Sequence, residues 1–144
     1  MKATELMIAD WVRIAPYDII DQVDCLLTEY AITSHGDSCG QYDYKDIEPI
    51  PLTPEILEKN GFDKWEDDGG VPLWSLPLWS LDKKEVRYCM TFEVIDGGCP
   101  VLTIEDVVDG DSRHTSIVLK DEVYNVHDLQ HVLRFLGLEI QIII

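Results

Sequence analysis

Residues 86–119, VRYCMTFEVIDGGCPVLTIEDVVDGDSRHTSIVL, carry the clearest strand pattern in the chain. Large apolar residues alternate with smaller or polar ones over 88–94, which is the period of a half-buried strand. Asp-Gly-Gly at 96–98 and Asp-Gly at 109–110 are typical of hairpin turns. We therefore predict an antiparallel meander of three strands over residues 86–119.

A helix is predicted after the meander, over residues 126–136. Asn125 can cap it, and Asp128 nearly completes a capping box. Apolar residues spaced three or four apart give the segment one buried stripe. The last residues, 138–144 (LEIQIII), predict a short apolar strand. Such a strand should add to a sheet or to a partner, because an unpaired apolar edge aggregates.

A second, shorter helix is predicted over residues 54–60. Thr53 can cap it, and Pro54 occupies the first helical position, where its missing N–H costs nothing. Asn60 and Gly61 then supply a left-handed stop. Because this helix is only about two turns long, tertiary packing must hold it in place.

The first fifty residues are harder to interpret. Residues 5–14 predict an opening strand, and residues 41–47 another short one. Residues 18–33 fit either a helical stripe or two short strands with a turn near Asp24.

An exact tandem repeat, PLWSL, occupies residues 72–76 and 77–81. Two prolines five residues apart argue against a regular central strand or a helix through it. We therefore expect Trp74 and Trp79 on an extended or turn-rich loop. The two indoles would either cover the core or form an exposed docking patch.

The chain is strongly acidic. It has 28 Asp and Glu against 11 Lys and Arg, a net charge of −17 on 144 residues. This field repels nucleic acid and anionic lipid and favours a basic protein surface as partner. The acids concentrate in residues 17–48, 49–70 and 96–128, which form either one patch or a hydrated shell.

Other features bear on compartment and cofactors. The four cysteines include no C-x-x-C pair, the first residues lack an apolar core, and no apolar run approaches the ~20 residues of a membrane span. We expect a cytoplasmic protein with reduced thiols, no membrane contact and no cofactor.

His127 and His131 have the one spacing typical of a metal site. Histidines four residues apart on a helix can share a zinc ion, so a metal-dependent hydrolase is an alternative. No third ligand is marked by spacing, and a solvated helix face explains the same pattern. The acid runs at 66–70 and 106–111 lack the spacing of a calcium loop and are typical of turns. No nucleophile motif or phosphate loop is present in the sequence, so we do not expect an enzyme.

Three stretches carry a resemblance: ELMIADWV at 5–12, EPIPLTPEILEKNGF at 48–62 and VYNVHDLQHVLRFLG at 123–137. They resemble uncharacterised small proteins encoded by phages and mobile elements of gut anaerobes. The resemblance implies an opening strand and a small SH3-like or KOW-like barrel, which favours strands over helix in 18–33. It implies no activity and no catalytic residue.

The sequence thus predicts an α+β protein with a single domain over 1–144. An SH3-like barrel or curled antiparallel sheet would occupy 1–50, and the short helix, meander and C-terminal helix 51–144. The favoured function is a non-catalytic acidic protein-binding module. The predicted binding residues are Trp74, Trp79, Asp67, Asp68, Asp106, Asp109 and Asp111.

Three other functions stay open at this point. A nucleic-acid mimic could inhibit a host defence nuclease or a DNA-binding protein, because carboxylates can replace phosphates in a basic groove. The metal-dependent hydrolase would use His127 and His131. A virion structural or assembly protein could use the final strand to form a homodimer.

Overall fold

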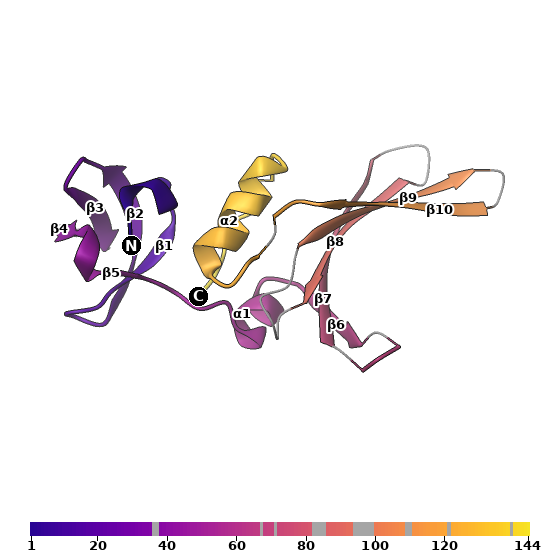
Figure 1. The fold of residues 1–144 in the computed structure, drawn as a ribbon, viewed down its shortest axis with the longest axis horizontal. Helices are drawn as coiled ribbons and strands as arrows, with labels where there is room; N and C mark the ends of the chain where they lie inside the picture. Colours follow the sequence, from indigo (N-terminus) through magenta and orange to yellow (C-terminus); the bar gives the residue numbers. More distant parts are fainter. Residues whose placement is uncertain are drawn as a thin grey trace. The chain divides into compact units, whose positions relative to one another are not determined.

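The computed structural model describes residues 1–35, 38–66, 68–70, 72–81, 86–93, 100–108, 111–120, 122–138 and 140–144. Figure 1 shows antiparallel sheets and α-helices, which confirms the α+β class. The chain divides into two compact units. The first unit comprises Met1–Pro51 with Asn125–Ile140, and the second comprises Leu52–Tyr124 with Gln141–Ile144. The part of the chain that the structure describes contains no helix long and apolar enough to span a membrane.

The first unit holds a five-stranded antiparallel sheet with the order β4-β3-β2-β1-β5. Its elements are the 3₁₀ turn η1 (Ala3–Glu5), β1 (Trp11–Ile14), β2 (Ile19–Leu26), β3 (Tyr30–His35), β4 (Ser38–Asp43), the 3₁₀ turn η2 (Tyr44–Asp46), β5 (Ile47–Pro49) and α2 (Val126–Phe135).

This first sheet must curl. β4 and β5 lie at opposite edges, and only the three residues of η2 connect them. Four residue steps span at most about 14 Å. Five strands laid flat would be about 19 Å wide. The sheet edges therefore have to approach each other, and the amino group of Met1 donates to the carbonyls of Tyr44 and Ile47 at this point, both at 2.9 Å.

The strand interpretation of residues 18–33 is confirmed, with two adjustments. The turn falls at 27–29, and Asp24 instead lies where the β2–β3 register shifts between Val23 and Cys25. The predicted strand over 5–14 begins only at Trp11, because Ala9 has a φ of +65° and turns the chain just before it. The core of this sheet is made of apolar residues from each side of these turns: Leu6, Val12, Ile14, Val23, Ala31 and Ile47.

Helix α2 confirms the prediction for 126–136 to within one residue. The backbone N–H of Asn125 donates to Oδ2 of Asp128 at 3.2 Å, so the Asp128 half of the predicted capping box is formed. Val126, Leu129 and Leu133 are buried along one stripe. Helix α2 contacts β1 in the first unit.

The second unit holds a five-stranded antiparallel sheet with the order β10-β9-β8-β7-β6. Its elements are α1 (Pro54–Lys59), β6 (Asp63–Glu66), β7 (Pro72–Leu81), β8 (Val86–Glu93), β9 (Val101–Val108) and β10 (Asp111–Val118). The predicted meander corresponds to β8, β9 and β10. Its turn residues 96–98 and 109–110 lie outside the described residues. Helix α1 begins as predicted, with the Thr53 hydroxyl accepting from the N–H of Ile56 at 3.4 Å.

The PLWSL repeat forms strand β7, so the prediction of a loop is wrong. Among the strands that the structure describes, β6 opposes only residues 72–75, and from Leu76 onward β7 pairs with β8 alone. The second half of β7 is therefore an edge, where a proline such as Pro77 is tolerated. The β7–β8 register then shifts between Leu78 and Ser80.

The predicted strand over 138–144 is also wrong, since residues 140–144 form no strand. The side-chain amide of Asn60 donates to the carbonyl of Ile143 at 2.8 Å and accepts from its N–H at 2.8 Å. Ile142 is buried. One side chain thus satisfies the N–H and the C=O of Ile143, which a partner strand could otherwise pair.

Candidate functional site

The structure does not show the two tryptophans of the repeat forming an exposed docking patch. Trp74 is only 1% exposed, which corrects its predicted role as an exposed anchor. The ammonium of Lys64 lies 5.9 Å from its ring centroid, a cation–π distance. Trp79 belongs to β7, and its side chain lies outside the described residues. Of the two interpretations, core coverage applies to Trp74.

The five predicted binding acids belong to three different segments. Asp68 is exposed in the turn after β6. Asp106 lies in β9 opposite Arg113, and Asp111 opens β10. The side chains of Asp106 and Asp111, and the whole of Asp67 and Asp109, lie outside the description, so their role in binding stays a prediction.

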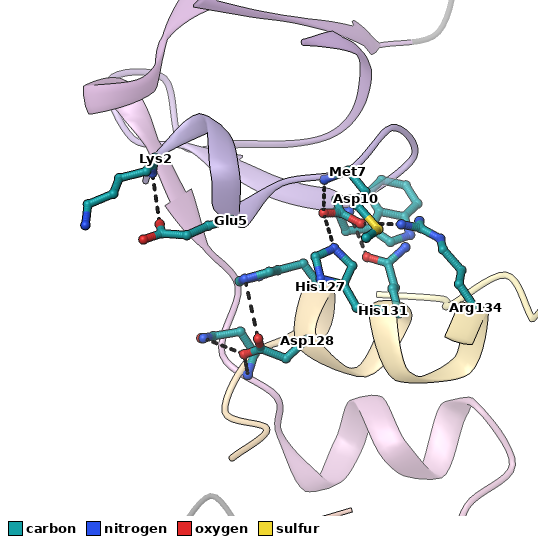
Figure 2. A network of polar contacts seen from close by, with 11 residues as sticks. Lys2, Glu5, Met7, Asp10, His127, Asp128, His131 and Arg134 are labelled. Carbon is teal, nitrogen blue, oxygen red and sulfur yellow. Dashed lines mark hydrogen bonds and ion pairs between the residues drawn. The ribbon is translucent and has the colours of Figure 1, made fainter. Parts of the chain in front are cut away.

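A polar network in the first unit centres on Asp10, a residue that the sequence did not single out (Figure 2). Its side chain is fully buried. Oδ2 accepts from the N–H of Met7 at 2.7 Å and lies 2.7 Å from Nε2 of His131. Oδ1 accepts from the guanidinium of Arg134 at 2.6 Å. His131 and Arg134 are three residues apart on α2 and therefore face the same side.

Gln130 extends this network to the backbone. Its Oε1 accepts from the N–H of Trp11 at 2.9 Å, and its Nε2 donates to the carbonyl of Ala9 at 2.9 Å. Polar side chains of α2 thus hydrogen-bond the backbone groups just before and at the start of β1. The network fixes α2 on the first sheet, which is a structural role.

The histidine pair gains no support as a metal site. The rings of His127 and His131 meet edge to face, with centroids 5.7 Å apart. Nε2 of His131 is engaged by Asp10, and Nε2 of His127 lies 3.8 Å from Oδ1 of Asp128. Across the described part of the chain, no group of three or more His, Cys, Asp or Glu side chains is arranged to hold a metal ion.

A different surface is available at β6, and no pattern in the sequence indicated it. All four of its residues are exposed, and Trp65 is 47% exposed. Side chains alternate along a strand, so Asp63 and Trp65 share one face and Lys64 points to the face that bears Trp74. Trp65 lies opposite the half-buried Leu73 of β7. DKWE has a single apolar residue and no alternation that indicates a strand, and the acids that follow it favoured a turn.

Carboxylates dominate the exposed charge in both units. Acids outnumber bases by twelve to four in 1–51 with 125–140, and by sixteen to seven in the rest of the chain. The described acids that are exposed are Glu5, Asp18, Asp24, Glu29, Asp43, Glu48, Glu55, Glu58, Asp63, Glu66, Asp68 and Glu122. The acid surplus is therefore a property of each unit, not of one segment.

No family model, no curated protein and no solved structure matches this chain. The function therefore has to be argued from the chemistry of the surfaces.

Proposed function

We propose that the protein is a non-catalytic binding module that recognises a basic surface on another protein. The observation that carries the proposal is the exposed acid surplus of each unit. A field of one sign steers an oppositely charged partner and raises its association rate, and it disfavours acidic partners.

The exposed ion pairs that the structure describes do not remove this surplus. Arg13 pairs with Asp18 at 2.7 Å, and Lys45 pairs with Asp43 at 2.9 Å. The hydrogen bond and the charge of Asp43 raise the pKa of Lys45, so this base stays protonated beside its acid. Each such pair removes one acid and one base together, and the surplus of carboxylates is unchanged.

The fold of the first unit is compatible with this role. We infer that its sheet is a small SH3-like barrel, because β4 and β5 take opposite edges and are joined by a single 3₁₀ turn. Such a barrel is a rigid platform for exposed side chains. The fold alone does not define a function, so the proposal rests on the exposed acid surplus.

The test first isolates a partner and then measures how its affinity depends on salt concentration. The intact protein is immobilised, and proteins retained from a lysate of the cell that carries its gene are identified and purified. Affinity is then titrated between about 50 and 500 mM salt, where screening weakens exposed charge pairs. We expect a basic partner whose affinity falls at least tenfold over this range.

Two charge-neutralised variants serve as matched controls. The first replaces Asp24, Glu29 and Glu48 of the first unit by amides, and the second replaces Asp63, Glu66 and Asp68 of the second unit by amides. At least one of them should bind more weakly and with a shallower salt dependence. The proposal would be overturned if the partner bound equally well at low and high salt. It would also be overturned if both variants bound the partner as tightly as the wild type does. Displacement by duplex DNA would instead indicate a nucleic-acid mimic.

A further inference from the structure

We propose that the outer edge of β6 is a strand-addition site for an extended basic segment of the partner, with Trp65 as its anchor. The inference rests on the proposed function and names the place and mode of binding. It assigns the partner segment an extended conformation with Lys or Arg side chains.

The backbone geometry supplies the first argument. β6 pairs with β7 and ends the order β10-β9-β8-β7-β6. In an antiparallel pair, alternate residues direct their N–H and C=O groups away from the partner strand. The four exposed residues of β6 therefore offer an outer edge to which a further strand can hydrogen-bond.

Trp65 supplies the second argument. With 47% of its surface exposed, the indole is large, apolar and accessible. Its cross-strand neighbour Leu73 is half-buried, so apolar surface continues from one strand to the next. Tryptophan is among the residues most often found as binding hot spots, because it buries a large area at a small entropic cost.

The charges around Trp65 select the occupant. Asp63, Glu66 and Asp68 are all exposed; Asp63 shares the face of Trp65, and Glu66 shares the face of Lys64. The single base of the strand, Lys64, lies over the ring of Trp74 at 5.9 Å, on the face opposite Trp65. A Lys or Arg in the added strand would therefore meet carboxylates.

The same charges disfavour a second copy of β6 as the occupant. Two antiparallel copies in register would place Asp63 of each opposite Glu66 of the other. Like charges directly opposite each other destabilise a strand pair. The opposite edge of the sheet, β10, instead exposes the apolar Ile117 and Val118, which carry no preference for a basic segment.

The test uses a labelled peptide, Lys-Val-Lys-Val-Lys-Val with blocked ends, and the full chain. Two further versions carry N-methyl groups on alternate residues, one set in each phase. An added strand directs only alternate N–H groups to the protein, so one version should bind about tenfold more weakly than the other. Simple charge attraction would treat both versions alike, since their charges are identical.

Variants locate the site. Trp65→Ala and Asp63→Lys should each weaken peptide binding about tenfold, and the matched edge variant Ile117→Ala should bind as the wild type does. Failure of the peptide to bind, equal binding of both methylated versions, or no effect of Trp65→Ala would overturn the inference. The proposed function would survive such a result if the purified partner still bound with a steep salt dependence.

Discussion

The guanidinium of Arg134 donates a hydrogen bond of 2.6 Å to Oδ1 of Asp10, a carboxylate with no exposed side-chain surface, across 124 residues of sequence. A buried charge is tolerated only when it is paired and hydrogen-bonded. Asp10 meets this condition through Arg134, His131 and the N–H of Met7. Asp10 is therefore one of the attachments between the first sheet and α2, beside the two hydrogen bonds of Gln130.

Asp10→Asn should destabilise the first unit by about 3 kcal/mol, because the amide cannot accept from all three donors. The measurement is urea unfolding together with hydrogen exchange of the α2 amides, which should accelerate. The matched control is Asp18→Asn, which breaks the exposed pair with Arg13 and should cost less than about 1 kcal/mol. Equal losses for the two variants would show that the network does not hold α2.

The elements that the sequence predicted well are those whose signals are local. Thr53 and Pro54 start α1, and Asn125 with Asp128 starts α2, because capping involves residues only three apart. The strands of the meander follow from alternation within each strand. None of these elements depends on contacts with residues that are far away in the sequence.

The features that the sequence missed depend on distant partners. Nothing near Asp10 indicates His131, which lies 121 residues away. Pro77 argued against a strand, but it is tolerated because β6 is too short to reach it. The apolar tail suggested a strand, but Asn60 had already satisfied Ile143. In each case tertiary context outweighed a local preference.

Glu55 should titrate below its ordinary value. A hydrogen bond from its own backbone N–H, and a second one with Thr53, lower its pKa from 4.5. A lowered pKa means that the ionised group stabilises α1 above its unfolded pKa, and that this contribution disappears as pH falls through the folded pKa. Side-chain NMR titration measures the value directly. Thr53→Ala should move the pKa upward, and a Glu55 pKa above 4.5 in the wild type would contradict this account.

Gly40 should resist substitution because of Tyr42. A Cβ at residue 40 would collide with the Tyr42 ring, which is two residues along β4 on the same face. That ring also meets Tyr17 edge to face, with centroids 6.0 Å apart. Gly40→Ala should therefore cost about 1–2 kcal/mol through displacement of the ring.

A double-mutant cycle separates this clash from a general intolerance of strand β4. In the Tyr42→Ala background, the further change Gly40→Ala should cost much less than it does alone, because the obstructing ring is absent. The measurement is denaturant unfolding of the four proteins. Additive losses would mean that Gly40 is needed for its own backbone conformation.

Asn60 should control the C-terminal tail. Its Nδ2 donates to the carbonyls of Ile56 and Ile143, and its Oδ1 accepts from the N–H of Ile143. Asn60→Asp keeps the acceptor but replaces the donor by an oxygen that faces two carbonyls. We expect this variant to release the tail, with a cost of about 1–3 kcal/mol.

The readout for the tail is local. Hydrogen exchange at Ile143 and the rate of carboxypeptidase digestion should both rise in Asn60→Asp, and the exposed control Gln141→Ala should leave both unchanged. Ile142→Ala tests the other attachment, since Ile142 is 1% exposed and its packing also holds the segment. If Ile142→Ala releases the tail while Asn60→Asp does not, burial of Ile142 holds the segment. The hydrogen bonds of the Asn60 amide are then not needed to hold it.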